Sequence, residues 1–335
     1  MAPKKVTRNQ LAGAARAALG GGRRLVAVER LTGGTRKGVY RLTMDDSTTA
    51  IAYLWENSEN YWPTTEHDDD LADPFSPGFG LDLFEAAHAR LEALGLRVLE
   101  VHLVDRDRTH YPADLAIVED IPGGALMDLR NRDPHAAEPT MMRLSESLAV
   151  MRSHRAPSFG KVALIDGGGT SRYASCEQAA LAFALRCLAE ATARDHRIAD
   201  ARDQLEERLR QLTAAVRPRA EYSVVHGELG LDHVMVDRNG HPVVIDIEDL
   251  MYFDVEWEHV FLRLRHTDSQ YQQLAADGLD EDRLALYKLT QHLSLTAGPL
   301  RLLDGDFPDR EFMRGIAEHH LNEALAMAPV RTVCT

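Results

Sequence analysis

Three short apolar runs, each followed by ionisable residues, constrain the fold of this 335-residue chain more than any other feature. The run at 223–225 predicts a buried strand, and His226-Gly227-Glu228 ends it. Two more runs, 234–236 and 242–245, flank a segment with Asn-Gly, the strongest short-range signal of a β-hairpin. The second of them leads directly into Asp246. The pattern therefore predicts two carboxylates at strand ends, which suits a hydroxyl-orienting base that faces a magnesium ligand.

This stretch resembles the catalytic core of the aminoglycoside phosphotransferase family, whose fold is similar to that of protein kinases. The family has His-Gly-Asp-Leu, three residues and Asn, then Ile-Asp, and later Gly-Asp-Pro with Asp-Leu. The chain has His226-Gly227-Glu228-Leu229, His233, Ile245-Asp246, Asp254 and Glu258 in the same order. The resemblance implies a two-lobed, protein-kinase-like α+β fold. A small antiparallel-sheet lobe that binds nucleotide is expected over 1–121, and a mostly helical lobe with the catalytic loop and substrate site over 122–335.

The resemblance also implies transfer of a phosphoryl group from ATP or GTP, with Mg²⁺, to a hydroxyl of a small molecule. Glu228 takes the place of the catalytic aspartate, and Asp232 is a second candidate for orienting the hydroxyl. The implied metal ligands are His233, which stands where the family has asparagine, and Asp246. His226 is implied to hold the loop in place, with the carboxylate of Asp254 as its partner.

A glycine-rich segment between strands expected at 24–30 and 39–43 lies where kinase-like folds cover the nucleotide phosphates. Its candidate phosphate contacts are Gly33, Gly34, Thr35, Arg36 and Lys37. The third expected strand, 48–55, lacks the lysine that kinases and their relatives usually carry there, and Lys37 or Arg36 is a candidate replacement. The helix expected over 81–95 corresponds to the kinase helix whose glutamate pairs with that lysine, here Glu85 or Glu92. The hinge is expected at 119–124, where the backbone of Glu119 and Ile121 would meet adenine.

Acidic and aromatic residues after the hairpin are the candidate acceptor-binding groups, namely Asp249, Tyr252, Glu256 and Glu258. They suit a polyhydroxylated or amine-bearing molecule, such as an aminoglycoside or another natural-product antibiotic. The polar, acidic segment 56–80 is interpreted either as a lid for a cationic substrate or as a solvated, partly disordered insertion, and we favour the insertion.

Composition limits the partners and the compartment. The net charge of −14 disfavours nucleic acid and anionic membranes and would attract cationic substrates. No apolar run is long enough for a transmembrane helix, and the first residues lack a signal-peptide pattern. Three cysteines without metal-binding spacing indicate a reducing cytoplasm. The oligomeric state is not predicted.

Other functions stay open at this point. A metabolic kinase for a sugar, choline-like or homoserine-like acceptor would share every feature above, and a nucleotide-binding pseudokinase would share most of them. The ionisable residues of the core stretch, together with His241, are also compatible with a transition-metal site, although they lack a His-Glu-x-x-His pair. The adjacent pair His319-His320 is expected at the surface of a helix.

Overall fold

The computed structural model describes residues 6–32, 34–63 and 70–328. They form two compact units, each built from separate stretches of the chain. The first comprises Met1–Trp62, Gly78–Ser147 and Leu231–Asp249, and the second comprises Pro63–Pro77, Leu148–Gly230 and Leu250–Thr335. An antiparallel sheet dominates the first unit and helices dominate the second, which confirms the expected fold class.

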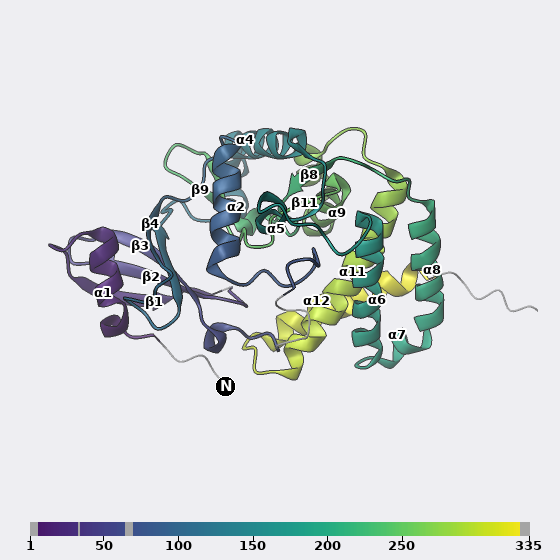
Figure 1. Ribbon diagram of the computed structural model, residues 1–335, viewed down its shortest axis with the longest axis horizontal. Coiled ribbons are helices and arrows are strands. Elements are labelled where there is room, and N and C mark those ends of the chain that lie inside the picture. Colours follow the sequence, from purple (N-terminus) through teal and green to yellow (C-terminus); the bar gives the residue numbers. More distant parts are fainter. Residues whose placement is uncertain (1–5, 33, 64–69, 329–335) are drawn as a thin grey trace, which may run out of the picture. The chain divides into compact units, whose positions relative to one another are not determined.

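The first unit is built on a five-stranded antiparallel sheet in the order β1-β2-β3-β5-β4 (Figure 1). The strands are β1 (Leu25–Arg30), β2 (Gly38–Met44), β3 (Thr49–Trp55), β4 (Val101–Asp105) and β5 (Asp114–Glu119). Successive side chains of β3 point to opposite faces. Ala52 and Leu54 belong to the core beneath α1 (Arg8–Leu19), whereas Tyr53 and Trp55 contact Phe84 of α2 (Leu81–Ala93). The sheet is therefore covered by one helix on each face.

The predicted hairpin is present in the first unit as β9 (Val234–Val236) and β10 (Pro242–Val244). Its turn closes with a hydrogen bond from the amide of Gly240 to the carbonyl of Asp237, at 3.0 Å, and Gly240 has a φ of 72°, which glycine adopts without strain. The Thr140 hydroxyl donates to the Gly240 carbonyl at 3.0 Å, and Arg143 donates to the Asn239 carbonyl at 2.7 Å. The hairpin tip is thus fixed to helix α4 (Pro134–Ser153).

Three further elements complete the first unit: η1 (Asn57–Glu59), α3 (Leu126–Arg132) and η2 (Leu231–His233). Ala125, just before α3, forms a β-bridge with Met235 of β9. The neighbouring Gly123 lies so close to the backbone of Val236 that a Cβ at Gly123 would be 2.1 Å from the Val236 carbonyl oxygen. Glycine is required at position 123 for this close approach.

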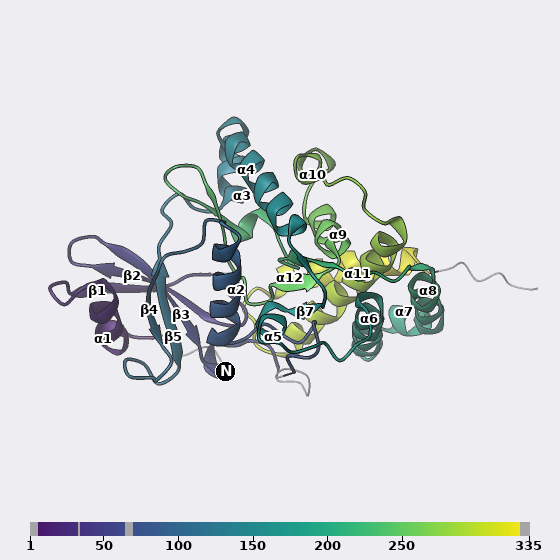
Figure 2. The same ribbon diagram turned by 45° about the horizontal axis from the view of Figure 1, so that its top comes forward.

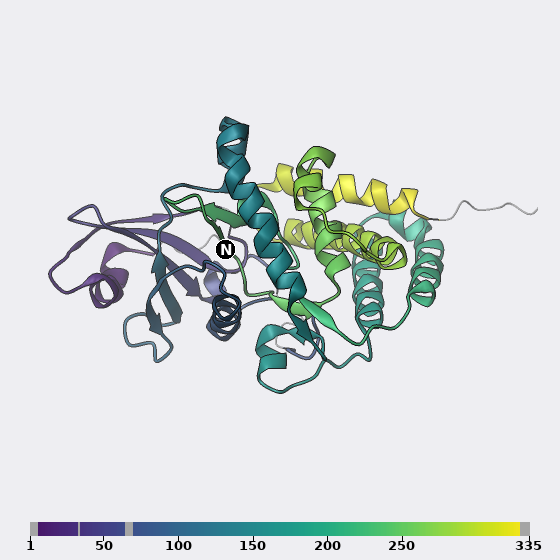
Figure 3. The ribbon, with the colours of Figure 1, turned by 90° about the horizontal axis from the view of Figure 1, so that it is seen from above.

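The second unit combines a four-stranded sheet with eight of the described helices (Figures 2 and 3). The sheet order is β6-β8-β11-β7, from β6 (Arg155–Ala156), β7 (Gly160–Lys161), β8 (Tyr222–Val225) and β11 (Met251–Phe253). The helices are α5 (Val162–Asp166), α6 (Cys176–Thr192), α7 (His196–Asp200), α8 (Arg202–Ala215), α9 (Val255–Arg265), α10 (Asp268–Leu274), α11 (Glu281–Asp304) and α12 (Arg310–Ala326). Helix α11 packs against α6, α8, α9 and α12, and therefore forms the centre of this unit.

The acidic segment is only partly as expected. Residues 64–69 lie outside the described part, but Asp73 is fully buried and forms an ion pair with Arg186 at 2.8 Å. Phe75 stacks on Phe183, with ring centroids 4.6 Å apart, and also contacts Trp257. The interpretation as a solvated insertion is therefore wrong for this portion, because its aromatic residue and its buried carboxylate both find partners in the second unit.

A few other expectations need correction. Strand β11 and helix α10 were not expected from the sequence. His320 is buried, with its Nδ1 2.9 Å from Nδ1 of His292, so only His319 of that pair is at the surface. None of the described helices combines enough length and apolarity to cross a lipid bilayer.

Candidate functional site

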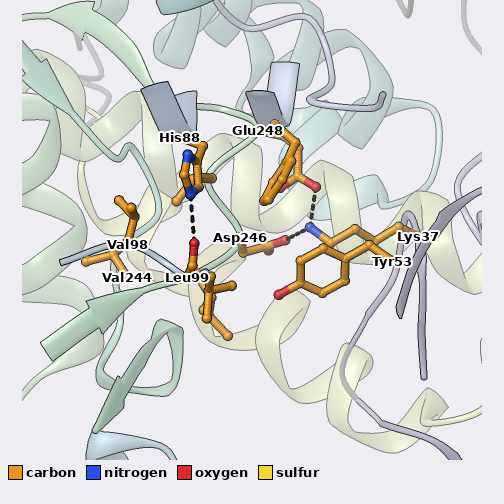
Figure 4. Close-up of a pocket in the computed structure, with 11 residues that line it drawn as sticks. Lys37, Tyr53, His88, Val98, Leu99, Val244, Asp246 and Glu248 are labelled. Atoms are coloured by element: carbon orange, nitrogen blue, oxygen red, sulfur yellow. Dashed lines mark hydrogen bonds and ion pairs between the residues drawn. The ribbon is translucent and has the colours of Figure 1, made fainter. Parts of the chain in front are cut away.

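The first unit contains a buried cluster of one lysine and two carboxylates (Figure 4). Lys37, immediately before β2, places its Nζ 2.8 Å from Oδ1 of Asp246 and also binds the carboxylate of Glu248. Lys37 is 8% exposed and Glu248 is 5% exposed. Burial by itself would lower the pKa of Lys37, but attraction to Asp246 and Glu248 outweighs it and raises that pKa above its ordinary value. Lys37 therefore stays charged.

Burial has the opposite effect on Glu248. It raises the pKa of this carboxyl above its ordinary value, against the attraction of Lys37, and the neighbouring Asp246 raises it further. Two carboxylates share one ammonium, so the cluster carries a net negative charge when all three groups are ionised. Such a site is suited to accepting a further cation.

The backbone at Asp246 is unusual. Its φ of 61° lies in the left-handed region, which non-glycine residues rarely adopt. The other described non-glycine residues with positive φ, Ser47 and Arg108, are exposed. Asp246 is also exposed, at 54% of its side chain, but it directly follows a strand of the hairpin and binds Lys37. A strained backbone of this kind costs about 1–3 kcal/mol and is concentrated at functional sites.

The two predicted metal ligands lie close together. Nε2 of His233 is 4.0 Å from Oδ2 of Asp246, and the amide of Ile245 donates to the His233 carbonyl at 2.9 Å. In the part of the chain that the structure describes, no set of three or more His, Cys, Asp or Glu side chains could hold a metal ion. Mg²⁺ at nucleotide sites commonly takes one or two protein ligands, with phosphate oxygens and water completing its shell. Asp246 fits that pattern, whereas the imidazole of His233 is a softer ligand than Mg²⁺ prefers.

The glycine-rich segment is braced by residues 57–62 of the same unit. The amide of Tyr61 donates to the Thr35 carbonyl at 2.9 Å, and the Arg36 guanidinium lies 4.7 Å from the centre of the Trp62 ring. A Cβ at Gly34 would be 2.9 Å from the Lys37 carbonyl oxygen. Arg36 therefore packs on an aromatic ring, whereas Lys37 reaches the carboxylates. Gly33, the remaining predicted contact, lies outside the described residues.

Helix α2 lines the pocket around Lys37 with an aromatic ring and a histidine, and not with a glutamate. Phe84 and His88 line this pocket, and a ring nitrogen of His88 is 2.7 Å from the Leu99 carbonyl oxygen (Figure 4). Glu85 forms an ion pair with Arg106, and Glu92 is exposed. Neither glutamate of α2 is the partner of Lys37.

The expected hinge carries backbone groups that are already engaged. The amide of Glu119 donates to the Glu100 carbonyl at 2.8 Å, and the Glu119 carboxylate binds Arg97. Ile121 is buried, and its carbonyl oxygen is 3.5 Å from the amide of Gly124. The Glu119 amide and the Ile121 carbonyl are therefore already hydrogen-bonded within the protein. The predicted contact of this segment with adenine would use its other backbone groups, and the role of Glu119 and Ile121 stays a prediction.

In the second unit, Glu258 holds the loop that carries the predicted base. Its Oε2 accepts hydrogen bonds from the amides of His226, at 2.5 Å, and Gly227, at 3.1 Å. The indole of Trp257 donates to the Gly227 carbonyl at 3.2 Å, and Gly227 has a φ of 92°. Burial raises the pKa of Glu258 to about 6, although the amides favour its ionised form. Glu228 itself is exposed at the end of this loop.

The predicted role of Asp254 requires a correction. This residue is fully buried and binds Arg283, Tyr287 and Arg219, whereas the loop amides are held by Glu258. The sequence pattern pointed to a carboxylate near the start of α9. The loop amides are held by a carboxylate four residues farther along the chain than the expected one.

The predicted acceptor residues are mostly part of the interior. Glu256 is fully buried between Arg219, at 2.8 Å, and the amide of Asp280, at 3.0 Å. Tyr252 is buried and donates to Asp166 at 2.9 Å. Together with Glu258, these residues hold the second unit together in the structure, because β11 and the start of α9 run through its core.

Two predicted residues of the first unit remain partly accessible. Asp249 is half-buried, and a Cβ at Gly78 would be 2.6 Å from its carboxylate, so Asp249 packs directly on the backbone of Gly78. Asp232 is half-buried in η2, next to His233. Sequence reasoning missed the pairing of Glu248 with Lys37. The available signal was the closeness of the two carboxylates in the sequence, with Glu248 only two residues after Asp246.

Comparisons with known proteins agree with this arrangement. A family model described as "Phosphotransferase enzyme family" matches residues 49–290, well over half of the chain. No curated protein sequence matches the chain significantly.

Three solved structures resemble the chain over most of its length. An apo thermostable mutant of aminoglycoside phosphotransferase APH(4)-Ia is 16% identical, with 90% of this chain and 95% of that chain covered and a TM-score of 0.60. Choline kinase LicA from Streptococcus pneumoniae is 13% identical, with 95% and 98% covered and a TM-score of 0.59. A putative fructosamine-3-kinase from Thermobifida fusca is 18% identical, with 96% and 100% covered and a TM-score of 0.55. APH(4)-Ia has also been solved in a ternary complex with AMP-PNP and hygromycin B.

Proposed function

Because this chain belongs to the phosphotransferase enzyme family, we propose that it transfers the γ-phosphoryl group of ATP or GTP to a hydroxyl of a small molecule. The observation that carries the proposal is the cluster at the end of the hairpin. There, the half-exposed carboxylate of Asp246 lies within 4.0 Å of His233 and is bound by the ammonium of Lys37. Anionic and cationic groups side by side suit a metal-bound nucleotide.

Asp246 and His233 would hold Mg²⁺, which supplies neutralisation of the phosphate charge when it is bound. Lys37 would bind phosphate oxygens, and the glycine-rich segment would approach them through its backbone. These residues would hold the phosphates of the donor in a fixed position. Most of the catalytic effect in phosphoryl transfer comes from such positioning and from electrostatic stabilisation.

Glu228 would accept a hydrogen bond from the acceptor hydroxyl and then its proton. The hydroxyl oxygen forms a new bond to the γ-phosphorus while the bond from that phosphorus to the bridging oxygen breaks, and ADP or GDP leaves. The amides of His226 and Gly227, held by Glu258, keep the loop of Glu228 rigid. Glu228 has one methylene more than aspartate, so its carboxylate would reach the hydroxyl through a different rotamer or a shifted backbone.

We infer that the acceptor is a small hydroxylated molecule, and we favour a cationic one because the chain carries a net charge of −14. Antibiotic inactivation and metabolic phosphorylation both fit, since the similar structures include kinases named for an aminoglycoside, choline and fructosamine. We also place the protein in the cytoplasm. Cys176 and Cys187 are buried free thiols, as expected for a reducing compartment.

A screen for phosphate transfer tests this proposal. The purified chain is incubated with Mg²⁺ and ATP or GTP, against a library of hydroxylated antibiotics and of sugar, choline-like and homoserine-like metabolites. Mass spectrometry should show one added phosphate on one class of compound, and Asp246→Ala should abolish it. Nucleotide binding without transfer to any compound would contradict the proposal and favour a pseudokinase.

A further inference from the structure

The place of the expected lysine on the third strand is taken by an aromatic ring. Tyr53 is the residue of β3 that lines the pocket together with Lys37, Asp246 and Glu248 (Figure 4). Its ring also contacts Phe84 of α2, with centroids 5.8 Å apart. A lysine on β3 that faced this pocket would have to stand at position 53.

Lys37 reaches the same place from the neighbouring strand. Val39 lies directly opposite Tyr53 in the register of β2 and β3, and opposed residues share a face of the sheet. Lys37, two residues before Val39, belongs to that face as well. Its long stem carries Nζ to 5.0 Å from the centre of the Tyr53 ring, where the ammonium is stabilised by the aromatic face.

Glu248 supplies the carboxylate that α2 does not. It is buried, it comes from the segment after β10, and it binds the ammonium of Lys37 directly. A carboxylate at this depth is expensive to bury without a partner. Glu248 is farther from solvent than Asp246, so it is the group that holds Lys37 in position, while Asp246 keeps an exposed oxygen.

We propose that Lys37 and Glu248 form a relocated lysine–glutamate pair, in which Glu248 positions Lys37 and the Lys37 ammonium binds the phosphates of the nucleotide. Tyr53 fills the volume that a lysine on β3 would occupy. This inference rests on the proposed function only in assuming that a nucleotide binds next to Lys37. It assigns the missing phosphate-binding group to one residue and gives Glu248 a positioning role.

Labelling of the unmodified protein tests the position of Lys37 without any substitution. An acyl-phosphate derivative of ATP acylates a lysine amine that lies next to bound phosphates. The chain has five lysines, so peptide mapping can separate them. We expect acylation at Lys37, and excess ATP with Mg²⁺ should block it. Acylation of Lys288, which is exposed on α11, should not change when ATP is added. ATP-protected labelling at another lysine, or no protected labelling, would overturn the inference.

Substitutions then separate charge from packing. Lys37→Met keeps the apolar stem and should weaken binding of ATP with Mg²⁺ about ten- to a hundredfold in calorimetry without acceptor, the range for loss of a charge-assisted hydrogen bond. Adding Tyr53→Lys to Lys37→Met should restore most of the affinity, because it returns an ammonium to the pocket. Lys288→Met is the matched control and should bind nucleotide as the unmodified chain does.

Glu248 needs a measurement that a purely structural role would not affect. Glu248→Gln should reduce acylation of Lys37 by the ATP derivative and lower kcat more than it raises KM for ATP. Glu248→Asp should recover part of both effects. Equal labelling in Glu248→Gln and in the unmodified chain would contradict the positioning role.

The outcomes distinguish the two proposals. One outcome is that the unmodified chain binds nucleotide but phosphorylates no acceptor, and that Lys37→Met loses this binding. It would contradict the proposed function and support the relocated pair. Phosphate transfer that proceeds equally well in Lys37→Met would support the function and overturn the pair. A chain that binds no nucleotide would contradict both.

Discussion

Each unit of this protein contains a cluster of charged side chains, and the two clusters differ in access to solvent. In the first unit, Asp246 and Glu248 share the single ammonium of Lys37. In the second unit, two guanidinium groups, those of Arg219 and Arg283, face three carboxylates, those of Asp254, Glu256 and Glu177. The Asp246 side chain is 54% exposed and that of Asp254 is fully buried.

This difference separates a cluster that can take up a ligand from one that holds a fold together. Asp254 is enclosed by Arg219, Arg283 and the Tyr287 hydroxyl, so its charge is compensated within the protein. Asp246 has a strained backbone, and it shares the single ammonium of Lys37 with a second carboxylate. A carboxylate enclosed by its partners holds a structure together, whereas a partly exposed carboxylate is accessible to a counterion.

The largest expected effect concerns stability, in the second unit. Arg283→Met should lower the free energy of unfolding by about 3–5 kcal/mol, because it leaves the buried Asp254 without its main counter-charge. Urea denaturation at pH 7 measures this. Lys288→Met, an exposed lysine-to-methionine change on the same helix, is the control and should be close to neutral. A similar, small loss of unfolding free energy in both variants would show that the cluster of the second unit does not hold the fold together.

The next effect concerns activity, in the first unit. Asp246→Asn retains a residue that tolerates the left-handed backbone but removes the charge, so the chain should stay folded. We expect phosphate transfer to fall by roughly 10²- to 10³-fold, the range for loss of one group that stabilises developing charge. Asp45→Asn, in an exposed turn of the same unit, should leave the rate unchanged. An Asp246→Asn variant that unfolds at neutral pH would show that this cluster is structural after all.

A moderate effect is expected from the paired histidines on α11 and α12. Burial lowers the pKa of His292 to about 3 and that of His320 to about 4. Both values lie below the unfolded value of about 6.5, so their contribution is complete above that pH and is lost as pH falls toward the folded values.

His292→Gln removes one of these titrations. The decrease in unfolding free energy between pH 7 and pH 5 should become smaller by roughly 1–2 kcal/mol, since each pKa unit corresponds to about 1.4 kcal/mol. His319→Gln, on the exposed neighbour, is the control. Parallel pH profiles for His292→Gln and the unmodified chain would show that this pair does not add to the acid sensitivity of the second unit.

The smallest effect is expected on α2. Glu85→Gln breaks an exposed ion pair with Arg106, which contributes little because water screens it. The unfolding midpoint should change by less than about 2 °C, and nucleotide binding should not change. Loss of nucleotide affinity in this variant would mean that the helix supplies a functional glutamate, and Glu248 would lose the role proposed for it.

The fold was largely predictable because its signals are local. Alternation marked the strands of the first unit, and Asn239-Gly240 marked the hairpin with its correct turn. The short strands β6, β7 and β11 were not predictable as a sheet. Each has two or three residues, and β6 and β7 pair with strands about 70 and 90 residues away.

The candidate site was predictable in its chemistry and less so in its partners. Asp246 and His233 were selected from order and spacing, and the structure brings them together. Which of Lys37 and Arg36 reaches the carboxylates depends on Trp62, whose ring lies against Arg36. Glu256 looked accessible because it is charged, but the deciding fact is Arg219, which is distant in sequence. Charge alone does not separate a binding residue from a buried pair.

The tyrosine on the third strand has a consequence for chemical selectivity. Tyr53 presents a ring to the pocket, and Lys37 enters from the glycine-rich segment. An inhibitor with a flat group against this ring and an acidic group toward Lys37 would match a surface that relatives with a third-strand lysine do not have. A compound of this shape would discriminate this protein from such kinases through one aromatic side chain.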